Sequence, residues 1–352
     1  MAYKILYIED LQPGSIIHEL QANGFEAEHY NPESLEELLQ KVVGFDLLLL
    51  DFRLTESKKI IFDAPTIAQT IRTVGGSVQM DIPIVLISTE KNICDYFRDY
   101  SSQDLFDYSV SKEIFLENIK KYTTRFIDVI EAYKKVIENK GDLSKTLALK
   151  TDEIQNIDYR IVEKLSSEIF ADNVFAYNNF ILNHIIRSTG ILVGEDVLSA
   201  RLGVSMDSPD WENLKAKLID FKYSGIYSNA YERWWSFKLD HWWEEMNKGI
   251  SLRRLNATQR VQKLIGNTDL QSLIPQEKLA HSSSSNFWTI CKDSKMPIDS
   301  LDGLELHQRD LFPWQEKEYI SIKAGLESSD LTKYIKQSDK ARLREIMKQL
   351  EV

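Results

Sequence analysis

Residues 47–54 read LLLLDFRL, and this stretch decides the fold of the N-terminal part of the chain. The apolar run that ends at Leu50 has no polar alternation, which is typical of a strand buried on both faces of a sheet. Asp51 follows directly. The sequence therefore predicts a central strand over residues 45–50 that brings a carboxylate to one edge of a sheet.

Four more apolar runs surround this strand and alternate with helical patterns. The predicted strands cover residues 3–8, 25–30, 45–50, 82–87 and 105–110. The predicted helices cover residues 13–23, 32–43, 64–74 and 91–100, and Asn31-Pro32 is expected to cap the second of them. Five strands alternating with helices indicate an α/β fold with a five-stranded, doubly wound parallel sheet.

Polar side chains follow four of the predicted strands. Glu9 and Asp10 follow the first strand, Asp51 the third and Ser88 the fourth, and Lys112 comes shortly after the fifth. Ligands of such sheets bind at the carboxyl ends of the strands, which meet at one edge. We therefore expect these five side chains to converge there.

This set of residue types suits phosphoryl transfer. Three crowded carboxylates are unfavourable unless a divalent cation neutralises them, and Mg²⁺ prefers such oxygen ligands. Asp51 is then placed to act as a carboxylate nucleophile toward a phosphoryl group. Lys112 and Ser88 can hold phosphoryl oxygens as charge spreads over them in the transition state.

Four motifs in this order resemble the receiver domain of two-component response regulators. They are ILYIED (5–10), LLLLDFRL (47–54), IVLIST (84–89) and DYSVSK (107–112), and the resemblance covers about residues 3–125. It implies a flavodoxin-like receiver domain over residues 1–125, phosphorylated on Asp51 by a sensor histidine kinase. It further implies no enzymatic activity beyond the receiver's own phosphorylation and dephosphorylation.

The resemblance also assigns roles to the residues around Asp51. Glu9 and Asp10 would be the acidic metal pair, and Arg53 would give its backbone carbonyl to Mg²⁺. Ser88 would be the switch hydroxyl and Lys112 the phosphate-binding lysine. An alternative is a pseudo-receiver that keeps the acids and works as a scaffold without phosphorylation.

The chain departs from the receiver pattern in three places. The interval between Asp51 and Ser88 is long, which indicates an insertion at residues 56–63 (ESKKIIFD). Glu113 follows the lysine where proline is common, and Tyr108 is the nearest candidate for the aromatic switch position. These departures bear on conformational switching more than on phosphorylation.

Residues 112–140 are predicted to form one long connecting helix. Apolar residues recur along it at alternating intervals of three and four, as in a heptad pattern. One interpretation is a seam for a homodimer; the other is an amphipathic helix, widened by Ile127, that packs on its own domain. The residues of the pattern are Leu116, Ile119, Thr123, Phe126, Ile130, Tyr133 and Ile137.

Residues 141–352 are predicted to form a second, mainly α-helical domain of unknown output. The predicted helices cover residues 151–170, 174–188, 210–222, 231–248, 252–265 and 330–350. The 231–248 helix would bury the face of Tyr231, Trp235, Leu239, Trp242 and Met246, as core or as a docking surface.

Two functions of this second part can be weighed from its residues. LSARLGVS (198–205) has the Gly turn of a helix-turn-helix, which would make the chain a transcriptional regulator. Residues 206–214, however, hold acids and no Lys or Arg. The motifs GxSxG, HExxH, Walker A and GxGxxG are absent, and the six histidines show no metal-ligand spacing.

Composition sets the remaining expectations. The net charge of −11 argues against general binding to nucleic acid or anionic lipid, and Cys94 and Cys291 argue for a reducing cytoplasm. No apolar run is long enough to span a membrane. The architecture resembles receiver-bearing buffer components of Detocs-like bacterial phage-defence systems. That resemblance implies antiviral signalling and a second receiver-containing effector that competes for phosphate.

Overall fold

The computed structural model describes residues 2–54, 62–73, 81–91, 93, 105–139, 141–308 and 310–350. Most of the predicted insertion and of the predicted helix at 91–100 lie outside these residues. The chain forms two compact units, which we call unit 1 (Met1–Leu182 with Ser224–Ala230) and unit 2 (Asn183–Tyr223 with Tyr231–Val352). The predicted domain division near residue 140 therefore falls inside unit 1.

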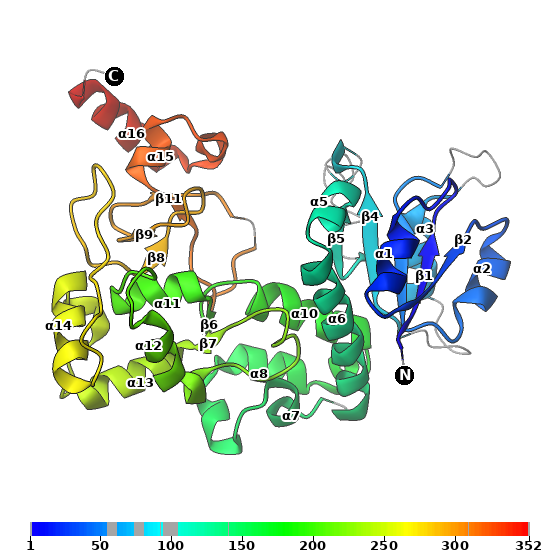
Figure 1. The fold of residues 1–352 in the computed structure, drawn as a ribbon, viewed down its shortest axis with the longest axis horizontal. Coiled ribbons are helices and arrows are strands. Elements are labelled where there is room, and N and C mark those ends of the chain that lie inside the picture. Colours follow the sequence, from blue (N-terminus) through cyan, green and yellow to red (C-terminus); the bar gives the residue numbers. More distant parts are fainter. Residues whose placement is uncertain are drawn as a thin grey trace. The chain divides into compact units, whose positions relative to one another are not determined.

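Unit 1 contains the predicted five-stranded parallel sheet. Its strands are β1 (Lys4–Ile8), β2 (Glu26–Tyr30), β3 (Leu47–Asp51), β4 (Ile84–Ser88) and β5 (Tyr108–Ser111). All pairs are parallel, and the order is β2-β1-β3-β4-β5 (Figure 1). This order is the flavodoxin-like one, in which the strand order reverses at a switch point between β1 and β3. The predicted fold class is confirmed.

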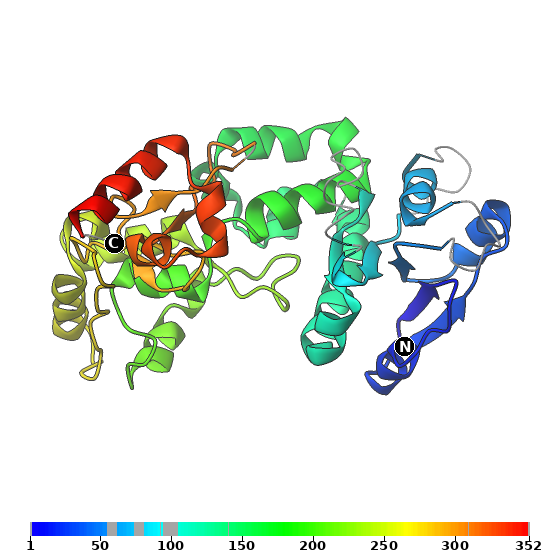
Figure 2. The same ribbon diagram turned by 90° about the horizontal axis from the view of Figure 1, so that it is seen from above.

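The burial of the strands follows the sequence pattern. Every residue of β3 and β4 is buried, whereas the edge strand β2 alternates between exposed and partly buried residues. Helices α1 (Ile16–Ala22), α2 (Leu35–Val42) and α3 (Ala64–Thr73) flank the sheet, as Figure 2 shows from above. Leu38 and Ile67 pack with Leu48 in one apolar core.

The helix predicted at 32–43 begins later than expected. Ser34 caps α2, because its hydroxyl accepts a hydrogen bond from the backbone N–H of Glu37 at 3.2 Å. The predicted cap at Asn31-Pro32 is therefore wrong. Asn31 instead donates its side-chain amide to the backbone carbonyl of Asp10, 3.0 Å away.

The predicted long helix at 112–140 is broken into α5 (Lys112–Glu117) and α6 (Ile119–Asn139). Asn118 ends α5 with non-helical backbone angles, and its side chain donates to the carbonyl of Ile114 at 3.1 Å. Asparagine favours such ends because its short amide competes with the backbone for hydrogen bonds. A single continuous helix is therefore wrong for this segment.

The apolar stripe of α6 packs within unit 1. Phe126, Ile130 and Tyr133 are buried, and α6 lies against α10 (Val174–Ile181). Ile127 and Ile137 are exposed. The structure thus favours packing on the helix's own unit over a dimer seam, but the widening of the stripe by Ile127 is wrong.

The helical part of unit 1 continues through α7 (Leu143–Leu147), the 3₁₀ turn η2 (Thr151–Asn156), α8 (Tyr159–Ser166), α9 (Glu168–Ala171) and α10. The helix predicted at 151–170 is therefore interrupted twice. Residues 224–230, which we call the return segment, also belong to this unit. Buried Asp128 of α6 accepts hydrogen bonds from the Asn229 amide and the Ala230 backbone N–H, at 2.8 and 2.5 Å.

Unit 2 is mainly helical, as predicted, but also contains three two-stranded sheets that were not predicted. Its helical elements and strands are the π-helical turn η3 (Leu182–Ile186, whose first residue lies in unit 1), β6 (Leu192–Val193), α11 (Glu195–Leu202), α12 (Trp211–Lys217), η4 (Ile219–Phe221), β7 (Trp234–Trp235), α13 (Ser236–Met246), η5 (Leu252–Arg254), α14 (Ala257–Asn267), β8 (Thr289–Ile290), β9 (Pro297–Ile298), β10 (Leu304–Glu305), β11 (Tyr319–Ile320), α15 (Ile322–Leu326), η6 (Asp330–Tyr334) and α16 (Gln337–Gln349).

The helix predicted at 231–248 is wrong in its first third. Trp234 and Trp235 form β7, which pairs antiparallel with β6, and α13 begins only at Ser236. Trp234, Trp235 and Trp243 are almost fully buried. The tryptophan-rich run therefore builds the core of unit 2, and the predicted helical face does not exist as such.

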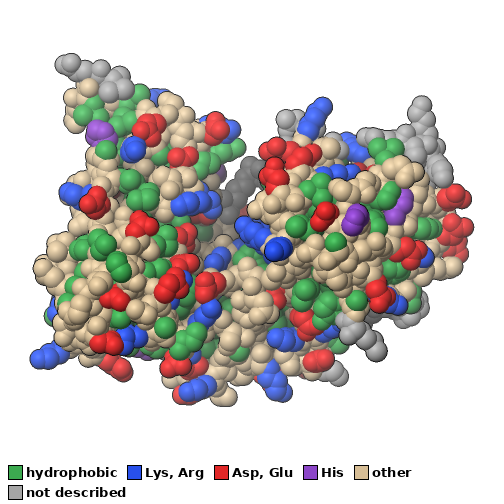
Figure 3. All heavy atoms as spheres, in the orientation of Figure 1, with side chains coloured by type: hydrophobic (Ala, Val, Ile, Leu, Met, Phe, Trp, Pro, Cys, Tyr) green, Lys and Arg blue, Asp and Glu red, His purple; other side chains and the backbone are tan. Residues whose placement is uncertain are grey.

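The helix-turn-helix interpretation is not supported, because Arg201 of the LSARLGVS motif is buried. Arg201 lies in α11 but is only 1 % exposed, with its guanidinium 4.4 Å from the ring of Trp288. A buried guanidinium cannot contact a DNA phosphate. Acidic and basic side chains are also interspersed on the face drawn in Figure 3. Of the helices formed by described residues, none combines the length and apolar character that a membrane span requires.

Candidate functional site

The sheet register brings the predicted site residues to one edge. Ile8 of β1 lies beside Leu50 of β3, so Glu9 is adjacent to Asp51. Asp51 lies beside Ile87, one residue before Ser88. Ser88 in turn lies beside Ser111, and Lys112 follows as the first residue of α5. The convergence that the sequence predicted is therefore present in the backbone.

Lys112 is the centre of the site. Its ammonium Nζ lies 2.5 Å from Oε2 of Glu9 and 3.1 Å from Oδ1 of Asp51. Both carboxylates are buried, at 2 % and 5 % exposure, and the lysine side chain is 27 % exposed. A single ammonium group therefore contacts two neighbouring buried acids, and the lysine stays partly open to solvent.

Residues that sequence reasoning missed hold Glu9 in place. The Tyr7 hydroxyl donates to Oε2 of Glu9 at 2.8 Å, and the backbone N–H of Leu11 donates to Oε1 at 3.3 Å. His29 of β2 contacts the backbone carbonyl of Glu9 through Nε2 at 2.8 Å. Tyr7 stands two residues before Glu9 on the same face of β1, so strand periodicity alone was a signal for it.

The electrostatics of the site keep Asp51 close to a protonation change near neutral pH. Burial raises the pKa of Asp51 to about 6; Lys112 opposes this shift and Glu9 adds to it. Burial tends to lower the pKa of Lys112, but Asp51 and Glu9 outweigh it and the pKa is raised. Burial and the neighbouring Glu9 also raise the pKa of Tyr7. At pH 7 the geometry thus favours an ionised Asp51 beside a charged Lys112.

Ser88 and Arg53 lie on either side of Asp51. Ser88 is 1 % exposed, and a hydrogen bond between its side chain and Asp51 helps to hold the pKa of that acid down. The Arg53 side chain pairs with Asp63 at 3.0 Å, and its guanidinium lies 4.7 Å from the ring of Phe52. The Arg53 side chain is thereby fixed beside the acceptor, while the role predicted for its backbone carbonyl stays a prediction.

The metal ligands predicted at Glu9, Asp10 and Asp51 stay a prediction. In the described part of the chain, no three Asp, Glu, His or Cys side chains are grouped so as to hold a metal ion. In this structure the Lys112 ammonium lies between Glu9 and Asp51 and supplies the positive charge beside both acids. Glu9 and Asp51 are thus both lysine partners, and Asp10 is a further buried carboxylate near this edge.

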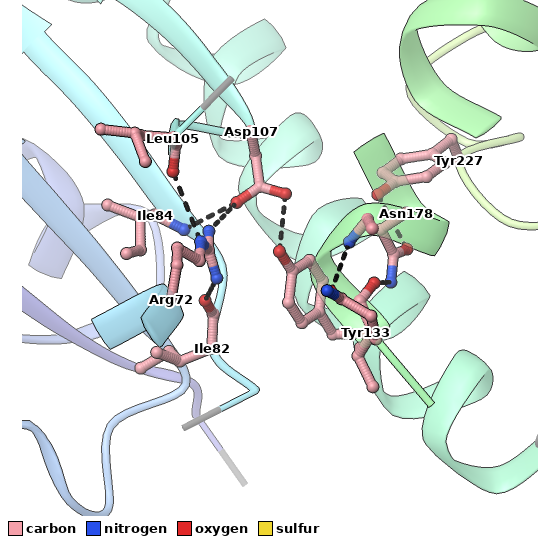
Figure 4. A network of polar contacts seen from close by, with 11 residues as sticks. Arg72, Ile82, Ile84, Leu105, Asp107, Tyr133, Asn178 and Tyr227 are labelled. Carbon is pink, nitrogen blue, oxygen red and sulfur yellow. Dashed lines mark hydrogen bonds and ion pairs between the residues drawn. The ribbon is translucent and has the colours of Figure 1, made fainter. Parts of the chain in front are cut away.

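A second polar network lies at the amino end of β5 (Figure 4). Buried Asp107 accepts hydrogen bonds from the Arg72 guanidinium at 3.1 Å, the Ile84 backbone N–H at 2.8 Å and the Tyr133 hydroxyl at 2.8 Å. Arg72 also lies 3.8 Å from the ring of Phe175 in α10. The network ties α3, β4 and α6 together, so the DYSVSK motif has a structural acid at one end and the site lysine at the other.

No family model matches the chain, and no curated protein matches it. Several solved structures resemble its N-terminal part. A CheY-like response regulator receiver domain from Methylobacillus flagellatus is 19 % identical, with 35 % of this chain and 99 % of that chain covered and a TM-score of 0.28. An adenylate cyclase structure from Rhodopirellula baltica is 15 % identical, with 39 % and 98 % covered and a TM-score of 0.29.

A third similar structure is the complex of histidine kinase ThkA with response regulator protein TrrA. The matched chain is 23 % identical, with 35 % of this chain and 97 % of that chain covered and a TM-score of 0.27. At these identities and TM-scores the likenesses carry no argument about function. The fold assignment rests on the strand order and register described above.

Proposed function

We propose that unit 1 is a phosphoacceptor of the response-regulator receiver type that takes a phosphoryl group onto Asp51. One observation carries the proposal: a buried carboxylate at the end of the central strand lies 3.1 Å from a lysine ammonium that also pairs with a second acid. This arrangement supplies a nucleophile and a cation at the edge where parallel sheets bind ligands.

The chemistry needs an ionised nucleophile. With the pKa of Asp51 at about 6, the carboxylate is mostly deprotonated at pH 7. One oxygen of Asp51 would attack phosphorus, and the bond from phosphorus to a histidine nitrogen of a sensor kinase would break, giving an acyl phosphate and a free imidazole. Lys112 and Ser88 are placed to bind the oxygens of the transferred group.

For the divalent cation predicted at Glu9, Asp10 and Asp51, we infer that Asp10 and Asp51 would be the carboxylate ligands. Both are buried oxygen donors, and the carbonyl of Arg53 would complete the protein ligands. Bound Mg²⁺ would supply positive charge to the phosphoryl oxygens during transfer. Glu9 would then serve to hold Lys112, whose ammonium it already contacts.

The direct test is phosphorylation of the full-length chain by acetyl phosphate with Mg²⁺, followed by intact mass measurement. We expect the wild type to gain the mass of one phosphoryl group and Asp51→Asn to gain none. Asp152→Asn changes an exposed aspartate of unit 1 and should behave as wild type. A wild type that never gains mass, or an Asp51→Asn variant that gains as much, would contradict the proposal and favour the scaffold alternative.

The metal assignment is tested separately. Magnesium should raise the melting temperature of the wild type, and Asp10→Asn should abolish that gain. Calcium and a chelator serve as controls, because a nonspecific charge effect would respond to either divalent cation. An equal gain in the Asp10→Asn variant would contradict the assignment.

Several finer parts of the proposal rest on sequence alone. A cytoplasmic location follows from the cysteine usage, whereas a role in bacterial phage defence and competition for phosphate with a second receiver-containing effector follow from resemblance. Phosphate buffering would be supported by an experiment that mixes this protein with such an effector and a phosphoryl donor. The amount of acyl phosphate on this protein should rise while the amount on the effector falls. The buried position of Arg201 counts against the alternative of a DNA-binding regulator.

A further inference from the structure

Unit 2 contains a polar cavity of about 520 Å³ that the proposed function leaves unexplained. Its wall combines the π-helical turn η3, the start of α11, the β8–β9 turn, Gln308 and residues between 310 and 318. Small-molecule sites commonly occupy roughly 300–1,000 Å³. The cavity is therefore large enough for a ligand of nucleotide size.

The cavity wall shows local features that are typical of binding sites. A π-helical turn is rare and often lies at a functional site, and η3 brings Asn183 and His184 to the wall. The carbonyl of His184 accepts hydrogen bonds from Trp314 Nε1 at 3.1 Å and Gln315 Nε2 at 3.2 Å. The unusual turn is thus fixed to the opposite wall rather than frayed.

Gly194 leaves room for charged groups at the wall. A Cβ atom at this position would lie 2.8 Å from Oδ1 of Asp196 and 3.0 Å from a guanidinium nitrogen of Arg233. Arg233 is itself oriented by donating from Nε to the carbonyl of Ile186 at 2.7 Å. Glycine therefore permits an arginine with a fixed orientation to line the cavity.

The charges of the wall leave positive groups available. Lys292 is paired with Glu318 at 2.5 Å, and Glu316 is paired with buried Arg201 at 2.9 Å. Arg187 and Lys295 form no ion pair with any residue in the described ranges. The basic wall residues are Arg187, Arg233, Lys292, Lys295 and Lys317, and the acidic ones are Asp196, Asp310, Glu316 and Glu318.

Glu316 is an acid of this wall that is already paired. Its Oε1 accepts the indole N–H of Trp288 at 2.9 Å and pairs with Arg201. Its Oε2 is buried and has no hydrogen-bond partner within the part of the chain that the structure describes. The ion pair with Arg201 offsets the negative charge of Glu316, so this acid does not cancel the basic residues of the wall.

We propose that this cavity binds a small organic phosphate of nucleotide size. The phosphate would contact Arg187, Arg233 and Lys295, since guanidinium groups match phosphate oxygens in pairs. The site is independent of Asp51 and would give unit 2 a ligand of its own.

Calorimetric titration of the full-length Asp51→Asn variant in a chelator tests the cavity without interference from the proposed phosphorylation site. ADP should bind at one saturable site, and adenosine and inorganic pyrophosphate should each bind more weakly. Arg187→Gln and Lys295→Gln should each weaken ADP binding by about tenfold, the usual effect of one lost charged hydrogen bond. Lys278→Gln changes an exposed lysine away from the cavity and should leave the affinity unchanged.

Three results would overturn the proposal. They are the absence of saturable ADP binding, an affinity for adenosine or pyrophosphate equal to that for ADP, and wild-type affinity in both cavity variants. Circular dichroism of each variant controls for folding. Since both altered residues are exposed, their substitution should leave the spectrum unchanged.

Discussion

The two units differ in how their buried backbone N–H and C=O groups find hydrogen-bond partners. In unit 1, five strands pair along their length and their ladders use the backbone groups of the core. In unit 2 the strands are two residues long, and buried charged side chains bind backbone groups instead. Arg260 is fully buried and donates to the carbonyls of Leu252, Ala200, Arg201 and Phe287 at 2.7–3.2 Å.

This difference shows how a core can be built from segments without regular secondary structure. Side chains then supply the hydrogen-bond donors that the buried backbone carbonyls need. A buried carbonyl without a partner costs free energy, and a guanidinium carries five donors in a fixed plane. Burial holds the pKa of Arg260 down, to about 10, yet the side chain stays charged at pH 7. The core of unit 2 should therefore depend on single polar residues more than the core of unit 1 does.

The largest effect should come from Arg260→Met, which keeps the apolar stem and removes every donor. We expect the free energy of unfolding of unit 2 to fall by about 4 kcal/mol, since each carbonyl left without a partner costs roughly 1–3 kcal/mol. All seven tryptophans lie in unit 2, so their fluorescence during urea unfolding reports on that unit. Arg254→Met, at an exposed position of η5, is the matched control. Equal midpoints for both variants would break the comparison.

A smaller loss is expected from Leu49→Ala in β3. Leu49 is fully buried, and such truncations in apolar cores cost about 3 kcal/mol through lost transfer energy and a residual cavity. Amide hydrogen exchange of the β3 segment should speed up, with no change in the tryptophan transition of unit 2. Val43→Ala, at a position that is 63 % exposed, should have little effect. A shift of the tryptophan transition would show that the units do not unfold separately.

Asp51 should make the free energy of unfolding of unit 1 depend on pH. Its pKa rises from 3.8 to about 6 on folding, so the folded state binds this proton more tightly than the unfolded state. Stability from this group is present at low pH and is lost as pH rises from about 4 to about 6. Asp51→Asn should therefore gain about 2 kcal/mol over wild type at pH 7, and less at pH 4.5.

Hydrogen exchange of unit 1 in a chelator at both pH values measures this difference. Asp152→Asn supplies the baseline, since that side chain is exposed. A gain of the same size at both pH values would contradict the assignment of the pH dependence to Asp51.

The smallest effect should come from Tyr133→Phe. The substitution removes the hydroxyl that donates to buried Asp107, which keeps its bonds to Arg72 and the Ile84 backbone. We expect a loss of about 1 kcal/mol, the usual net value of one hydrogen bond. Tyr122→Phe is the control on the same helix, and a chemical denaturation series followed by hydrogen exchange in α6 compares the two. A loss as large as that of Arg260→Met would mean that unit 1 also depends on single polar contacts.

The sheet and the site at its edge could be predicted because both follow from short, local sequence patterns. Uninterrupted apolar runs mark β3 and β4, and the residue after each run is placed by strand geometry alone. The role of Lys112 between Glu9 and Asp51 could not be predicted, because which acids share one cation depends on tertiary distances. The metal ligand set predicted at Glu9, Asp10 and Asp51 stays a prediction.

Unit 2 was harder to predict for a related reason. A strand of two residues carries no period, so β7 was hidden inside a run whose spacing also suits a helix. The break at Asn118 was visible only as one asparagine in a good helical pattern. The burial of Arg201 and Arg260 could not be predicted. Charged residues are rarely buried, and no local sequence pattern distinguishes a buried arginine from an exposed one.

The return segment makes the fold of unit 1 discontinuous along the chain. During synthesis, the carboxylate of Asp128 would emerge a hundred residues before Asn229 and Ala230, its hydrogen-bond donors. A recombinant fragment cut after residue 182 would keep the whole sheet and the proposed phosphorylation site while leaving this buried acid without those donors. Fragments meant to isolate the phosphoacceptor should therefore supply residues 224–230, for example through an engineered linker that rejoins them to the end of α10.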